Sequence, residues 1–225
     1  MKKSILTIFL ILMVLFSGAQ ELGITAGANI SYFRYQKEYF RFREDWQKSS
    51  AKVGGKFGIK FSKDFGNTKL FSIAGSGIGF ETGLFLSQAG GIVDWSDESK
   101  TNNSLIYLEL PCVINLNLNT KRLTIQLKAG TYVSTGLWGK VKWTYNGNES
   151  TRKIDWQEHP SSHASDYEKY DFGLLTGLGF AYKKIGLNIF YKAGLTDIYS
   201  TYLRRNQAFE ISLSYRIMKF KQKNK

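Results

Sequence analysis

Cysteine is almost absent from the sequence, which contains Cys112 and no other among its 225 residues. A single thiol excludes an intramolecular disulfide framework, and it leaves no cysteine cluster for zinc. Long apolar runs are missing after residue 20, where no stretch approaches the roughly 18 consecutive apolar residues that a membrane helix requires. Proline occurs only twice, whereas 22 glycines, 16 Phe, 13 Tyr and 5 Trp favour a β-rich fold.

The first 19 residues have the pattern of a secretory signal peptide. Lysines at positions 2 and 3 form a basic start, residues 5–16 form an apolar run, and residues 17–19 supply the small side chains of a cleavage site. No cysteine follows the run, so a lipoprotein anchor is not expected. We predict cleavage after Ala19, which leaves one domain of residues 20–225.

Acidic residues are few, since 31 Lys and Arg face 18 Asp and Glu and give a formal net charge of +13. Loss of the two lysines in the signal peptide lowers this charge to +11. Such a charge can indicate nucleic-acid binding. An exported chain rarely meets nucleic acid, so an anionic membrane surface is the favoured partner and no nucleic-acid binding is expected.

Apolar and polar residues alternate with period two from Ile106 to Leu118, which indicates a strand with one apolar and one polar face. The apolar face belongs either to the shared core of a sandwich or to a barrel whose outside meets lipid. Seven other segments repeat the pattern. The eight candidate strands are residues 22–32, 53–65, 71–88, 107–118, 123–133, 170–182, 185–192 and 209–217.

The connections between these strands alternate in length. Those after strands two, four and six span a few residues, and the other four are long and polar: residues 33–52, 89–103, 135–169 and 196–206. Short turns at one end and long loops at the other are typical of an outer-membrane barrel with both termini in the periplasm. We therefore predict an all-β fold, an eight-stranded antiparallel up-and-down transmembrane β-barrel, after an N-terminal signal peptide helix.

The tryptophans support this layout. All five lie in or beside the long connections, where an interfacial aromatic rim would place them: Trp46, Trp95, Trp138, Trp143 and Trp156. Within the third long connection, Asn146-Gly147 between two alternating segments predicts a hairpin that continues past the membrane.

Charged residues recur on the face opposite the apolar one, which becomes the barrel interior. We expect them to form a lumenal charge network: Lys56, Lys60, Glu81, Glu109, Lys128, Lys192, Glu210 and Arg216. Enclosed charges must be paired, and eight strands leave an interior that side chains just fill. A salt-bridged plug is therefore favoured over the alternative, a selective pore lined by lysines.

Two loops carry residues with functional alternatives. His159 and His163 lie near serines and Asp166, but a triad or a zinc site depends on geometry that neighbouring loop residues seldom supply, so a solvated loop is favoured. The first long loop interleaves aromatic residues with arginine. As a candidate surface-binding loop it would hold lipopolysaccharide phosphates or a protein partner, and the alternative is a strand pair with snorkelling charges; its residues are Arg34, Tyr39, Arg41 and Arg43.

Three short motifs, Gly23–Ser31, Glu81–Leu84 and Tyr107–Pro111, resemble the PorT-like "porin family" of outer-membrane β-barrels from Bacteroidota. The resemblance spans the whole mature chain and implies a barrel of about eight strands. One named member of that family serves the type IX secretion and gliding apparatus. Pro111 falls on a lumen-facing strand position, where proline removes a ladder donor, and the resemblance implies a tolerated local break or bulge there. The sequence also ends in KQKNK after Phe220 rather than in an aromatic residue.

The expected protein is a monomeric barrel of the bacterial outer membrane with a non-enzymatic structural or interaction role, such as a secretion or surface accessory. Its expected partners are outer-membrane lipid, lipopolysaccharide and envelope proteins. A narrow porin or small-solute transporter is the first alternative, and a lipid-modifying enzyme with a site at the rim is the second. We predict no catalytic residue, metal site or cofactor.

Overall fold

The fold is taken from a computed structural model, which describes residues 20–35, 48–67, 76–96, 98–157, 166–198 and 204–220. Within these ranges every regular element is a β-strand. The described residues include no helix long and apolar enough to cross a membrane.

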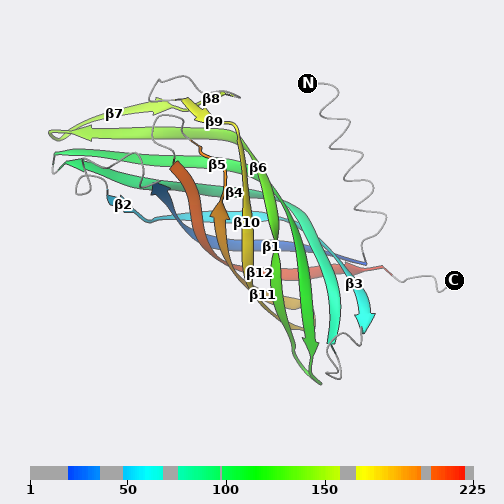
Figure 1. Ribbon diagram of the computed structural model, residues 1–225. Coiled ribbons are helices and arrows are strands. Elements are labelled where there is room, and N and C mark those ends of the chain that lie inside the picture. The colour runs from blue at the N-terminus through cyan, green and yellow to red at the C-terminus, as the bar shows by residue number, and fades with distance from the viewer. Residues whose placement is uncertain are drawn as a thin grey trace, which may run out of the picture.

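Eight long strands form the barrel wall, and four short ones lie at its loop end (Figure 1). The long strands are β1 (Glu21–Tyr35), β3 (Lys52–Asn67), β4 (Ser76–Ser96), β5 (Ser99–Asn119), β6 (Thr124–Tyr145), β10 (Tyr170–Tyr182), β11 (Ile185–Gly194) and β12 (Arg204–Lys219). The short strands are β2 (Lys48–Ser50), β7 (Asn148–Lys153), β8 (Asp155–Gln157) and β9 (Asp166–Glu168).

Each long strand pairs antiparallel with its neighbours in chain order, and two pairings close the ring. The first strand pairs with the last, β1 with β12, from Glu21↔Lys219 onward. The second closing pair is β6 with β10, which joins the two halves of the chain across the third long connection. Closure gives each long strand a paired neighbour on both sides over its described membrane-spanning part, as a lipid environment requires. The predicted eight-stranded up-and-down barrel is confirmed.

The wall is apolar on the outside and polar on the inside. Along β5 the odd-numbered residues from Thr101 to Asn117 are buried, while Ile114 on the even face is 59% exposed. Glu210 on the inner face of β12 is 1% exposed, whereas its neighbour Ile211 is 57% exposed. The apolar face of each strand therefore lies on the outside of the barrel, toward lipid, as a transmembrane barrel requires.

The strands are longer at the loop end than the sequence pattern suggested. The prediction of a long loop at residues 89–103 is wrong, because β4 continues to Ser96 and β5 begins at Ser99. Polar residues suggested a loop, but beyond the membrane the outer face of a strand meets water and tolerates polar side chains. The start predicted for the third strand, residues 71–75, lies outside the described residues.

The third long connection contains the predicted hairpin. Strand β6 extends to Tyr145 and turns back through Asn146 (φ 47°) and Gly147 (φ 75°) into β7. Two consecutive positive φ angles are those of a type I′ turn, whose twist matches that of the flanking strands. In Figure 1 the ends of β4 to β7 project together beyond the rest of the wall, so the barrel carries a sheet outside the membrane.

Candidate functional site

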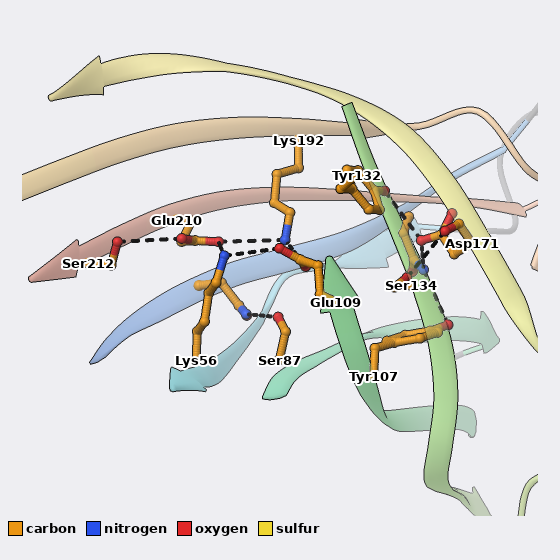
Figure 2. Close-up of polar contacts among 12 residues, drawn as sticks. Lys56, Ser87, Tyr107, Glu109, Tyr132, Ser134, Asp171, Lys192, Glu210 and Ser212 are labelled. Atoms are coloured by element: carbon orange, nitrogen blue, oxygen red, sulfur yellow. Dashed lines mark hydrogen bonds and ion pairs between the residues drawn. The ribbon is translucent and has the colours of Figure 1, made fainter. Parts of the chain in front are cut away.

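Four charged side chains from four strands meet in the centre of the barrel. Glu109 of β5 accepts from Lys56 of β3 at 3.0 Å through Oε1, and it accepts from Lys192 of β11 through Oε2. Glu210 of β12 accepts from Lys56 at 2.9 Å and lies 3.5 Å from Lys192. Figure 2 shows the two ammonium groups between the two carboxylates. Two lysines and two glutamates balance this central cluster.

A second cluster lies nearer the periplasmic turns. Glu81 of β4 accepts from Lys128 of β6 at 2.9 Å and from Lys60 of β3 at 3.3 Å, both through Oε2. Lys128 also donates to Asn188 Oδ1 at 2.7 Å. Two ammonium groups thus share one carboxylate, so this periplasmic cluster carries one excess positive charge.

Aromatic rings inside the barrel support the lysines. Lys56 Nζ lies 4.4 Å from the centroid of Phe85, and Lys192 and Lys128 lie 5.1 and 5.6 Å from Tyr132 and Phe190. Cation–π contacts at these distances stabilise ammonium groups that have lost water. These rings were not among the predicted site residues, although each has the strand parity of the inward-facing charges.

A third polar group surrounds Asp171 of β10, which is 3% exposed. Its carboxylate accepts from Asn206 at 2.9 Å, Thr196 at 2.7 Å and Tyr132 at 3.3 Å. Asn206 also donates to the hydroxyl of Tyr107 at 3.3 Å. Asp171 is not among the predicted site residues, although it shares the inward face of β10 with Gly173.

Apolar side chains fill the barrel at its outer end. They come from four of the wall strands, from β9 and from the segments after β7 and β11: Phe33, Val93, Leu105, Tyr107, Val141, Ile154, Tyr167 and Ile198. This outer apolar cluster was not predicted, since Ile154, Tyr167 and Ile198 lie in connections that were expected to be polar loops.

The structure describes the side chains of three of the five tryptophans predicted for the aromatic rim. Trp143 and Trp156 pack on the outer apolar cluster, and Trp156 contacts the rings of Tyr107 and Tyr167 with centroid distances of 5.4 and 6.2 Å. The Trp156 indole lies directly over Gly136 of β6, which has no side chain to exclude it. Trp138 is 51% exposed on the outside of β6, as a rim residue would be.

Several predicted residues lie elsewhere or beyond the described chain. Arg34 is exposed at the outer end of β1, and Arg216 lies at the periplasmic mouth, where it donates to Glu21 at 2.7 Å rather than joining the buried network. The side chain of Trp95 is not described. Trp46, Tyr39, Arg41, Arg43, His159 and His163 lie outside the described residues.

Cavities inside the described part of the barrel are much smaller at its centre and near Asp171 than at its periplasmic mouth. The periplasmic mouth holds a cavity of about 150 Å³. The cavities at the central cluster and around Asp171 measure about 20 and 30 Å³, room for one or two water molecules each. Among the described residues, no group of three or more His, Cys, Asp or Glu side chains is placed to hold a metal.

A closed antiparallel ring with a lipid-facing apolar exterior and a paired ionic interior defines a small outer-membrane β-barrel. A family model for the outer membrane protein beta-barrel domain matches residues 17–200. The chain belongs to this family, and its location is the outer membrane.

Solved structures of outer-membrane barrels are similar over most of this chain. Neisserial surface protein A matches at 11% identity with a TM-score of 0.47, covering 89% of this chain and 99% of its own. The attachment invasion locus protein Ail of Yersinia pestis matches at 12% identity and 0.41, covering 88% and 99%. OprG of Pseudomonas aeruginosa matches at 14% identity and 0.41, covering 89% and 97%. A search of curated proteins found no match.

Proposed function

We propose that this protein is a non-conducting, non-enzymatic barrel that holds an interaction surface at the outside of the outer membrane. The observation that carries this proposal is the filled interior. The central cluster occupies the middle of the barrel, the outer apolar cluster occupies its outer end, and the cavities between them measure about 20 and 30 Å³. A hydrated solute has no room to pass such a core.

The surface presented outside is the projecting sheet of β4 to β7. Its outward face carries Lys140 directly opposite Lys153. The ammonium of Lys52 donates to Asn102 and Ser104 at 2.5 Å each, and Ser104 is the partner of Lys140 on β5. Like charges directly opposite destabilise a strand pair, so this outer basic patch favours an anionic partner.

The level of the patch indicates which anion it meets. Lys140 lies two residues after Trp138 in β6. The indole of Trp138 is exposed, and exposed tryptophans on a barrel wall are typical of the level of the lipid headgroups. Two residues along a strand add roughly 7 Å, which places the ammonium groups among the headgroups of the outer leaflet. We propose that lipopolysaccharide phosphates bind there, and that the rest of the sheet contacts an envelope protein.

The resemblance of Gly23–Ser31 and Tyr107–Pro111 to the PorT-like proteins supports a finer proposal, an accessory role in surface secretion or adhesion. Crosslinking with mass spectrometry in the native outer membrane tests it, because a secretion accessory would crosslink to components of a secretion machine. Crosslinks to lipopolysaccharide alone would contradict the accessory role.

Conductance in planar bilayers tests the filled interior. The refolded mature protein is expected to give no single-channel steps above background. The double variant Val141→Ala with Ile154→Ala removes bulk from the outer apolar cluster. It tests whether that cluster helps to block the passage of ions through the barrel. Steady conductance of the unmodified protein would favour the narrow porin. Turnover of lipid A or phospholipid by it would instead favour the rim enzyme.

A further inference from the structure

The periplasmic mouth holds the largest of the three cavities described above, with a volume of about 150 Å³. An engineered protein cavity of that size accommodates benzene, so a small ligand group fits. Its walls come from the periplasmic ends of the strands, and its floor is the periplasmic cluster, where Lys60 and Glu81 line the cavity.

The lining is strongly basic. Six of the lining residues are cationic and three are anionic, and the ammonium groups of two of the six, Lys63 and Lys183, lie over the exposed rings of Phe65 and Tyr182. The cationic ones are Lys60, Lys63, Lys183, Lys184, Arg216 and Lys219, and the anionic ones are Glu21, Asp64 and Glu81. Glu21 already pairs with Arg216 at 2.7 Å and with Lys219 at 3.7 Å. The cavity therefore concentrates positive potential at the periplasmic side of the membrane.

The excess charge extends to the floor. Glu81 lies closer to Lys128, at 2.9 Å, than to Lys60, at 3.3 Å. The other contact of the Lys60 ammonium is Ser214 Oγ at 3.5 Å, a weak one. An ammonium has three donors, and the side chain of Lys60 is only 17% exposed. An anion in the cavity would satisfy this charge and balance the cluster.

We propose that the periplasmic mouth is a binding site for a phosphate group, with Lys60 at its floor and Arg216 at its rim. Ammonium and guanidinium donors form strong charge-assisted hydrogen bonds with phosphate oxygens. The phosphate comes either from a soluble periplasmic compound or from a phospholipid headgroup of the inner leaflet. This site is separate from the outer basic patch and from the outer apolar cluster, which support the proposed function.

Calorimetric titration of the refolded protein in non-ionic detergent tests the site with inorganic phosphate as probe, at constant ionic strength set by chloride. Lys60→Gln is expected to weaken phosphate binding by about tenfold, the usual effect of losing one charged hydrogen bond. The matched control is Lys121→Gln, which removes the same charge from an exposed turn residue that does not line the cavity. It is expected to change affinity less than twofold.

A second titration, with short-chain phosphatidylglycerol against phosphatidylcholine, separates the two sources of phosphate. Preference for phosphatidylglycerol that is lost in Lys60→Gln assigns the site to a lipid headgroup, and binding of inorganic phosphate alone assigns it to a soluble ligand. Heat-modified mobility on gels verifies that each variant is folded. The proposal is overturned if folded unmodified protein binds neither probe, or if Lys60→Gln and Lys121→Gln bind alike.

Discussion

At the scale of single residues, the interior is controlled by charge balance. Isolated burial of one ion costs several kcal/mol, and a buried pair offsets that cost only with good geometry and further hydrogen bonds. Glu109 meets this condition because it serves both Lys56 and Lys192, and the rings of Phe85 and Tyr132 contact those lysines. Loss of one carboxylate should therefore cost more than loss of a balanced pair.

Glu109→Gln leaves two buried ammonium groups against one carboxylate. We expect it to lower the free energy of unfolding by about 3–5 kcal/mol. Adding Lys192→Met restores the balance through the remaining Lys56–Glu210 pair at 2.9 Å, so the double variant should recover part of the loss. Urea titration in phospholipid vesicles measures both. Purely additive effects of the two substitutions would show that the charges do not interact.

The alternation of side chains along each strand predicted which charged residues face inward, but it could not predict which of them pair with one another. Lys56 bonds to Glu210, 154 positions away. That pairing depends on the stagger of strands around the ring, which no local pattern encodes. Asp171 was missed for a related reason, since its inward face also carries Gly173 and Gly177 and offers no charge pattern to notice.

At the scale of elements, the loop end behaves differently from the membrane span. Inside lipid each strand alternates strictly, and the eight strands were readable for that reason. Beyond lipid both faces of a strand can be polar, so the continuation of β4 and β5 was read as a loop. Asn146-Gly147 was an exception because its turn chemistry is local.

The fit of the β8 region over the mouth depends on Gly136. A Cβ added there would lie 2.4–2.5 Å from atoms of the Trp156 indole. Gly136→Ala should therefore displace the indole and destabilise the protein by about 1–3 kcal/mol, with a red-shifted tryptophan emission. Gly55→Ala is the control, since nothing lies within 4 Å of a Cβ at Gly55. Equal stability of the two variants would mean that Trp156 does not pack over β6.

The outer basic patch predicts two opposite effects from one substitution. Lys153→Glu places a carboxylate opposite Lys140, which should stabilise the β6–β7 hairpin by about 0.2–1 kcal/mol. The same change should weaken lipid A binding, because it removes a cation and adds an anion. Thermal unfolding in detergent, with and without lipid A, measures both effects. The control is Arg152→Gln, which lies opposite Val141 on the other face of the hairpin and should alter neither quantity. Unchanged lipid A binding in Lys153→Glu would contradict the proposal that lipopolysaccharide binds at this patch.

At the scale of the whole molecule, the reversed distribution of polarity determines where the protein can fold. Phe57, Ile114 and Leu213 are 58%, 59% and 58% exposed, which is unfavourable in water and favourable in hydrocarbon. The interior cannot compensate in water, because the buried charges of the central cluster are enclosed by the wall and pair with one another. We therefore expect the mature protein to aggregate when detergent is removed.

The depth of a charge on the outer wall tests this arrangement quantitatively. Ile114 lies five residues above the periplasmic end of β5 at Asn119, which at about 3.3 Å per residue and a tilt of about 40° is roughly 13 Å, near the middle of an apolar band of about 25 Å. Ile185 is almost equally exposed, at 56% against 59%, but it is the first residue of β11, next to the Lys183-Lys184 turn. Because the cost of an arginine depends on depth, Ile114→Arg should lower the free energy of unfolding by about 2–4 kcal/mol and Ile185→Arg by about 0–1 kcal/mol. Urea titration in phospholipid vesicles gives both values, and equal costs at the two positions would mean that the wall does not cross the bilayer at this register.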